Sequence, residues 1–332
     1  MVELKVMSLN GQDMIDLIPK NLKVPGKNSC HYWRAEILAA VIKKVDPDII
    51  GLVEAPPHPP RTDVFVNQFL GGGYSIHQGD KRGALGMAFL VRNSIDMEVN
   101  MRSKEQSQKD FKLDKYDANN DGITEIYKWW NRVPLEAAFS GGGLKAETTF
   151  ILIHAKSKGA FIPGDLFAYE KISHANRMKQ RAQADAIRRR LDQLIDDEGK
   201  GRVIVMGDMN DGPEFDKYAA MLGGGFLEPV MGSIWHPNKI MYNPHYPLDK
   251  KDRWTIDFLD RVVNPLGTSR YGMPSEMRSW IDHILVSPEL KECIVKDSTG
   301  ILHEQPRVPE LPKELRGMKG TDHHPPYVTL DL

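Results

Sequence analysis

Cysteine is scarce in this chain: Cys30 and Cys293 are the only two among 332 residues. Two cysteines can form at most one bond, so the disulfide framework of a small secreted scaffold is excluded. Long apolar runs are missing as well. No run reaches the roughly 18 residues that a membrane-spanning helix needs, and we therefore expect no membrane span.

Net charge is also nearly absent, because 44 lysines and arginines meet 45 acidic residues, which leaves −1. No global positive field therefore draws the protein to nucleic acid or anionic lipid, although a local basic patch is compatible with these totals. The first residues, MVELKVMSLN, lack the basic and apolar regions of a secretory leader, so no leader is expected there. The sequence therefore does not decide the cellular compartment, since a secreted protein could have lost its leader.

Short apolar runs bounded by polar residues or glycine predict buried strands. Two longer segments, 30–45 and 174–197, carry apolar residues at helical spacing, and the Asp46-Pro47 pair is expected to end the first helix. Because strands and helices mix without strict alternation, the pattern favours a layered α/β fold with mixed or antiparallel sheets. Two stretches, about 101–131 and 231–278, resemble loop insertions, where substrate selection often resides. The predicted strands are 4–9, 48–54, 85–91, 148–155, 202–208, 280–287 and a last one in YVTLDL.

Acids, amides and histidines lie at or near the ends of six of these apolar runs. Strand ends held by a buried sheet are rigid, so their side chains can converge on one cleft. Carboxylate and amide oxygens suit Mg²⁺, and a histidine held by a carboxylate can take a proton from water near neutral pH. This inventory favours phosphate-ester hydrolysis. The residues are Asn10, Glu54, His154, Asp208, Asn210, Asp282, Asp322 and His323.

These motifs resemble the endonuclease/exonuclease/phosphatase superfamily, whose members are similar to deoxyribonuclease I. Seven pieces occur in the order of that family and span nearly the whole chain, whereas one piece alone, such as GDMND, would be weak. The resemblance implies a single domain over residues 1–332 with a four-layer α/β sandwich, two packed mixed β-sheets flanked by helices. The matching pieces are VMSLN (6–10), DIIGLVE (48–54), RVP (132–134), LIHAKS (152–157), VIVMGDMNDGP (203–213), WIDHILVS (280–287) and GTDHHP (320–325).

The resemblance also implies a role for each matching residue. Glu54 would be the main metal ligand, with Asn10 and Asp322 beside it. His323 would be the general base, and Asp282 would hydrogen-bond it and fix its orientation. The neighbouring His324 should face away by strand alternation and serve packing or the surface. The remaining two residues, Asp208 and Asn210, would position the nucleophile and the phosphate.

Two more matches concern the phosphate. His154 resembles the histidine of the deoxyribonuclease and sphingomyelinase branches, which contacts the phosphate or serves as an acid. The strand GALGMAFLV lacks the acid that supports this histidine in deoxyribonuclease I, so a role as phosphate donor is favoured over one as acid. Arg132, in RVP, matches an arginine that contacts the scissile phosphate.

A separate metal signal lies in DANNDGITE at 117–125, where acids and amides alternate before a glycine as at the start of a calcium loop. The match then fails, because the twelfth position is Lys128 rather than a glutamate. A structural Ca²⁺ site and a simple polar loop both stay open. The candidate ligands are Asp117, Asn119, Asp121 and Glu125.

We therefore expect a phosphate-ester hydrolase that uses Mg²⁺, or Mn²⁺, and an activated water without a covalent intermediate. Nucleic acid is the first substrate expected. The alternative is a phosphodiesterase or phosphatase acting on a lipid headgroup, an inositol phosphate or another small phosphate ester. A calcium-binding interaction protein on an inactivated nuclease fold is a further reading, which the complete set of acids, amides and histidines disfavours. No obligate protein partner is evident, and a monomer is expected.

Overall fold

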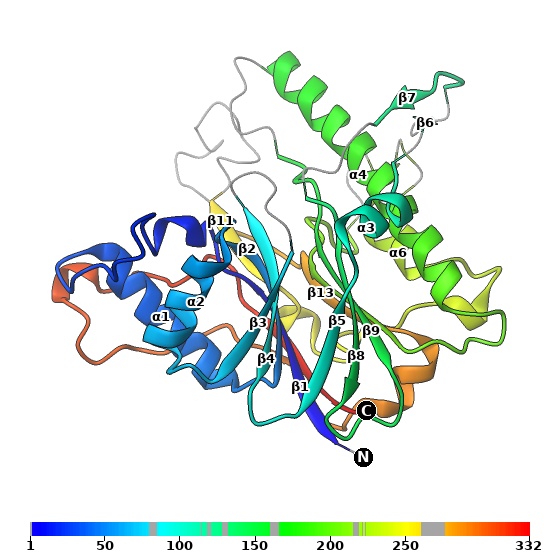
Figure 1. The fold of residues 1–332 in the computed structure, drawn as a ribbon. Coiled ribbons are helices and arrows are strands. Elements are labelled where there is room, and N and C mark those ends of the chain that lie inside the picture. The colour runs from blue at the N-terminus through cyan, green and yellow to red at the C-terminus, as the bar shows by residue number, and fades with distance from the viewer. Residues whose placement is uncertain are drawn as a thin grey trace.

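The computed structural model describes residues 2–79, 85–113, 115–117, 121–127, 132–159, 166–214, 219–220, 222, 224–259 and 276–332. Two mixed β-sheets pack face to face, with helices on the outer face of each (Figure 1). The fold is the four-layer α/β sandwich that the resemblance implied. No helix in the described ranges is long and apolar enough to cross a membrane.

The first sheet has one parallel pair, β1 with β2, and is otherwise antiparallel. Its outer face is covered by α1 (Cys30–Val45) and α2 (Pro59–Phe69), on the left of Figure 1. In spatial order its strands are β14 (Gly300–Ile301), β15 (Pro326–Asp331), β1 (Glu3–Asn10), β2 (Ile49–Ala55), β4 (Gly86–Arg92) and β3 (Tyr74–Gln78).

The second sheet is built in the same way around one parallel pair, β9 with β10. Its outer face is covered by α4 (Leu166–Leu194) and α6 (Leu227–Met231), on the right of Figure 1. In spatial order its strands are β13 (Asp282–Val286), β10 (Val203–Asp208), β9 (Thr148–His154), β8 (Leu135–Gly141) and β5 (Met97–Met101).

Three apolar layers hold the sandwich together. The central layer fills the space between the sheets with alternate residues of both, including the aromatic contact of Phe89 with Phe139, whose ring centroids are 5.4 Å apart. The other two layers join each sheet to its helices. Because all three layers are closely packed, the ends of the strands that they hold are fixed in position.

The stretches expected to be insertions contain short elements in their described parts. The first holds α3 (Lys104–Asp110), β6 (Lys115–Tyr116) and β7 (Glu125–Ile126). The second holds two 3-10 turns (Pro237–Lys239 and Lys250–Asp252), the strand β11 (Ile256–Leu259) and most of β12 (Glu276–Ser279). Strands β11 and β12 pair with each other as an antiparallel ribbon. The remaining 3-10 turns are Met14–Asp16, Pro288–Cys293 and Lys313–Leu315.

Candidate active site

The two parallel pairs end on the same side of the sandwich. Asn10 ends β1, and Glu54 lies one residue before the end of the neighbouring β2. In the other sheet, Asp208 at the end of β10 pairs with His154 at the end of β9 and with Asp282 at the start of β13. Five of the residues singled out from the sequence are thus placed by five adjacent strand ends.

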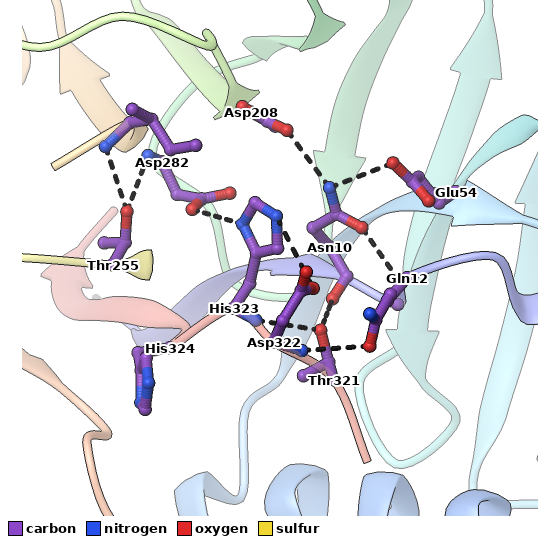
Figure 2. Close-up of polar contacts among 12 residues, drawn as sticks. Asn10, Gln12, Glu54, Asp208, Thr255, Asp282, Thr321, Asp322, His323 and His324 are labelled. Atoms are coloured by element: carbon purple, nitrogen blue, oxygen red, sulfur yellow. Dashed lines mark hydrogen bonds and ion pairs between the residues drawn. The ribbon is translucent and has the colours of Figure 1, made fainter. Parts of the chain in front are cut away.

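Polar contacts connect the two sheets at this point (Figure 2). The side-chain amide of Asn10 donates to Oε1 of Glu54 at 3.3 Å and to Oδ2 of Asp208 at 3.1 Å. Nε2 of His154 lies 3.6 Å from the same Glu54 oxygen and 3.7 Å from the same Asp208 oxygen. The structure therefore brings these four residues into one polar cluster, as expected from their order along the chain.

Two of the expected residues have a left-handed backbone conformation. Glu54 has a φ of 59° and sits where the register between β2 and β4 shifts, and Asn210 has a φ of 50°. Positive φ is unfavourable for glutamate and persists only where surrounding contacts impose it, whereas asparagine adopts it more readily. Such contacts are present: Asp13 N donates to Oε2 of Glu54 at 2.7 Å, and Asn210 N donates to Oδ1 of Asp208 at 2.8 Å.

His323 and Asp282 form a buried pair. Nδ1 of His323 lies 2.7 Å from Oδ2 of Asp282, and its Nε2 lies 3.8 Å from Oδ1 of Asp322. Burial alone would lower the pKa of His323, but the charges of Asp282, Asp208 and Asp322, together with the Asp282 hydrogen bond, raise it to about 10. The second ring nitrogen, Nε2, therefore lies on the side of Asp322, while Nδ1 is held by Asp282.

His324 points away from this pair (Figure 2). Its N–H donates to the carbonyl of Thr255 at 2.7 Å, its Nδ1 lies 3.3 Å from Leu302 O, and its ring meets Trp254 edge-on at 4.5 Å. The side chain is 3% exposed. Packing is therefore its role, as strand alternation predicted, and His323 is the histidine that contacts Asp282.

The donor set fits a divalent cation. One ligand atom each from Asp208, Asp282 and His323 lie within 4.8 Å of one another. Burial, followed by the charge of Asp282, raises the pKa of Asp208 to about 7, although the charge of His323 acts to lower it. In the described part of the chain, Oδ1 of Asp282 and Oδ1 of Asp322 are buried and accept no hydrogen bond. Hard oxygens with unused lone pairs suit Mg²⁺ or Mn²⁺.

The set of ligands expected from the resemblance, Glu54, Asn10 and Asp322, shares no residue with this trio. Oδ1 of Asn10 already accepts the N–H of Gln12 at 2.8 Å, and its amide nitrogen faces the carboxylates. The ligand set Glu54, Asn10 and Asp322 stays a prediction.

His154 and Arg132 lie beside the carboxylates. The pKa of His154 is held well below its usual value by burial and then by the charges of Arg132 and His323, so the imidazole is neutral at pH 7. A neutral ring can donate one hydrogen bond but is a poor acid, which agrees with the expected donor role. Burial also lowers the pKa of Arg132, while the charges of Glu54 and Asp208 act to raise it. Arg132 also lines a cleft of about 300 Å³.

Threonines at the site were missed by the sequence reasoning. Oγ1 of the fully buried Thr255 accepts the N–H groups of Ile281 at 3.0 Å and Asp282 at 2.9 Å. Oγ1 of Thr321 donates to Asn10 O at 2.7 Å and accepts His323 N at 3.1 Å. Both hydroxyls hold backbone groups of expected residues. A single threonine that acts in this way leaves no pattern in a sequence.

The 117–125 segment forms a polar turn in its described part. Asp117 accepts the N–H groups of Asp121 at 3.1 Å and Gly122 at 2.9 Å, and Asp121 accepts that of Ile123 at 2.8 Å. Asn119 lies outside the described residues. Calcium binding, with Glu125 as a further ligand, stays a prediction.

The sandwich and this polar cluster together define a phosphoester hydrolase with a deoxyribonuclease I-like fold. The chain belongs to the Endonuclease/Exonuclease/phosphatase family, whose model matches residues 30–323. No curated protein sequence gives a match.

Several solved structures are similar over their full length. Truncated TDP2 of Caenorhabditis elegans has 17% identity and a TM-score of 0.54, covering 99% of this chain and 97% of that one. TDP2 of D. rerio, complexed with a single-strand DNA product, has 16% identity, a TM-score of 0.53 and coverage of 100% of both chains. A mannosyl-6-phosphatase of Bacteroides thetaiotaomicron has 17% identity, a TM-score of 0.51 and coverage of 98% of both. At these identities the likeness shows a shared fold.

Proposed function

We propose that this protein is a Mg²⁺-dependent phosphodiesterase that cleaves nucleic acid by activated water. The observation that carries the proposal is the buried His323–Asp282 pair, which lies beside Asp208 and whose Nε2 lies 3.8 Å from Asp322. The proposal includes a single domain, because the family model spans strands of both sheets. It also includes action as a monomer.

In this mechanism Asp282 fixes the ring of His323, and Nε2 takes a proton from the attacking water. When held by Glu54, Asn10 and Asp322, Mg²⁺ would neutralise phosphoryl charge and bring the pKa of His323 down toward neutrality. Asn210 and Asp208 would orient the water and the phosphate.

On the other side of the phosphate, the neutral His154 and the guanidinium of Arg132 would donate to its oxygens as negative charge develops. The burial of both side chains strengthens these contacts, because few water molecules compete. No residue in this scheme forms a covalent bond to phosphorus.

Two observations bear on the substrate. A TDP2 of the same fold was crystallised with single-strand DNA product, which supports nucleic acid. A mannosyl-6-phosphatase also shares the fold, and this supports the alternative of a small phosphate ester, such as an inositol phosphate or a lipid headgroup. The net charge of −1 mildly favours that alternative.

A direct comparison of substrates tests the proposal. Purified protein would be assayed with Mg²⁺, Mn²⁺ or Ca²⁺ on plasmid DNA, a single-stranded oligonucleotide, bis-p-nitrophenyl phosphate, sphingomyelin and inositol phosphates. We expect hydrolysis with Mg²⁺ or Mn²⁺ and the highest kcat/KM on nucleic acid. A preference for inositol phosphates or sphingomyelin would select the alternative, and no turnover of any substrate would refute a phosphoesterase.

A further inference from the structure

A buried glutamine of α4 contacts both turns that leave the active-site ends of β9 and β10. Gln180 is 2% exposed. Its Nε2 donates to the carbonyls of Lys156 at 3.0 Å, Met209 at 3.2 Å and Asn210 at 3.0 Å. Only a donor fits among three carbonyl oxygens, so the amide nitrogen, and not the amide oxygen, faces the turns. One side chain therefore holds three backbone groups.

These two turns carry residues of the active site. Lys156 follows His154 by two residues, and Asn210 follows Asp208 by two. The turns are also joined to each other, because Ala155 N donates to Asp208 O at 2.9 Å. In addition, Nδ2 of Asn210 donates to Ala155 O at 3.2 Å. The glutamine is thus attached to a block that carries a histidine, a carboxylate and an amide of the site.

The backbone of Asn210 links the glutamine to the carboxylate of Asp208. Asn210 has a φ of 50°, its N–H donates to Oδ1 of Asp208 at 2.8 Å, and its carbonyl accepts from Gln180. Asparagine reaches this left-handed conformation more readily than most residues, but surrounding contacts still have to select it. Without the glutamine the carbonyl loses its donor, and the N–H that orients Asp208 can move with the turn.

Other contacts keep the turn after β10 in place when Gln180 is changed. Met209 N donates to Ile281 O at 2.9 Å. Nε2 of the buried His283 lies 2.9 Å from Asp211 O. Both contacts come from β13 and the residue before it rather than from α4. We therefore expect a variant of this glutamine to fold, and its defect to be a displacement of active-site groups within an intact fold.

We infer that Gln180 is a positioning residue for the hydrolysis: through the backbone of the two turns it aligns Asp208 and Asn210 with His154. The inference rests on the proposed function and deepens it, because it adds a residue of the outer helix layer to the groups that set the geometry around the phosphate. Gln180 acts on the second sheet, whereas the expected metal ligand Glu54 lies on the first. The need for Mg²⁺ should therefore not depend on this glutamine.

Two substitutions remove the donor, and two controls isolate its role. Q180M keeps the size of the side chain without a donor, and Q180E places carboxylate oxygens against the three carbonyls. Q183M is the first control, because Gln183 accepts Lys156 N at 2.9 Å and, within the described ranges, makes no hydrogen bond to the turn after β10. L191A is the second control. Leu191 is fully buried about 16 Å further along α4, so its truncation destabilises the fold without touching either turn.

The kinetic constants for bis-p-nitrophenyl phosphate would be measured well below the Tm of each variant, as determined by circular dichroism. For Q180M and Q180E we expect kcat to fall at least about tenfold while KM stays within about threefold, because misplaced groups act mainly on the transition state. The Mg²⁺ concentration for half-maximal rate should not change. In Q183M and L191A we expect kcat to stay within about threefold of wild type, although the Tm of L191A falls.

A wild-type kcat in Q180M, or equal falls in kcat in Q180M and L191A, would overturn the inference while leaving the hydrolase intact. A fall in Q183M as large as that in Q180M would overturn it too, because contact with both turns would then not matter.

If the wild type hydrolyses nothing, the proposed function fails, and hydrogen exchange measured by mass spectrometry still shows whether Gln180 holds the turns. Peptides covering 154–159 and 207–212 should exchange at least about tenfold faster in Q180M than in the wild type, while a peptide covering β8 should not change. Unchanged exchange in both turn peptides would refute the positioning role.

Discussion

Replacing Asp208 by asparagine should stabilise the metal-free protein and strongly reduce its activity. Asp208 is 2% exposed, and burial, followed by the charge of Asp282, raises its pKa from 3.8 to about 7. At about 1.4 kcal/mol per pKa unit, this rise means that keeping the ionised group in the fold costs about 4 kcal/mol. An amide carries no charge and avoids that cost.

The pH dependence has a definite sign. Below about pH 4 the carboxyl is protonated in both the folded and the unfolded chain, so ionisation contributes nothing. Between pH 4 and 7 Asp208 is ionised only in the unfolded chain, so its contribution lowers the free energy of unfolding of the wild type as the pH rises. The Asp208→Asn variant lacks this fall, so the difference between the two proteins should grow through this window.

The substitution also removes one hydrogen bond, which reduces the expected gain in the free energy of unfolding. The amide oxygen still accepts the N–H of Asn210, but the second carboxylate oxygen, which accepts from Asn10, is gone. That hydrogen bond is worth about 1 kcal/mol. In EDTA at pH 8, D208N should therefore be more stable than the wild type by about 3 kcal/mol.

Urea unfolding in EDTA from pH 4 to pH 8 measures this difference, and D249N, at an exposed carboxylate, is the control. We expect the D249N curve to follow the wild type within about 0.5 kcal/mol. Hydrolysis by D208N should fall at least about 10²-fold, because a group that orients the water and phosphate is removed. A difference between D208N and wild type that does not change with pH would refute the reasoning.

Three other changes test separate parts of the structure. Thr255→Val leaves the N–H groups of Ile281 and Asp282 without an acceptor, so the free energy of unfolding should fall by about 2 kcal/mol and the pH–rate profile should shift. Thr255→Ser should restore both the stability and the profile. A wild-type pH–rate profile in the valine variant would contradict the positioning role of Thr255. Gly207 has a φ of 131°, and Gly207→Ala places a Cβ against the carbonyl of Ile153. The free energy of unfolding should therefore fall by at least about 2 kcal/mol, measured by thermal unfolding. An unchanged Tm would be inconsistent with the close packing of β9 and β10. Ca²⁺ should raise the Tm of the wild type and not that of Asp121→Ala, and no calcium-dependent shift in the wild type would remove the proposed loop site.

The helices illustrate what local sequence can predict. The segment 30–45 was predicted correctly from end to end, because Ser29 caps its first turn and Asp46, at a φ of 54°, ends it before a proline. The second helix was predicted at 174–197 but spans Leu166–Leu194. Its early turns bury little, as the 77% exposure of Phe167 shows, so they carry no apolar periodicity.

The seven strands expected from the sequence match strands of the structure within one or two residues at each end, because buried runs of β-branched and aliphatic residues end where polar residues begin. Strands β3, β5 and β8 were not predicted. For example, β2 was expected at 48–54 and spans Ile49–Ala55. The choice of His323 over His324 also came from local alternation together with the family motif.

The assembly of the site could not be derived from local pattern. Asn10 and Asp208 are 198 positions apart, and their 3.1 Å contact depends on how two sheets pack. The position of polar residues at strand ends and the order of the family motifs predicted that such residues gather, but not which atoms meet. Thr255 had no motif to mark it, since it acts through backbone N–H groups.

The most direct test of the central claim is the rate of bis-p-nitrophenyl phosphate hydrolysis by wild type, His323→Ala and Glu54→Ala across a Mg²⁺ titration. We expect wild-type activity to require the cation and the rate of each variant to be at least about 10³-fold lower. We also expect Glu54→Ala to need more Mg²⁺ for half-maximal rate than His323→Ala. Wild-type activity that survives in EDTA, or near wild-type activity in His323→Ala, would contradict this mechanism.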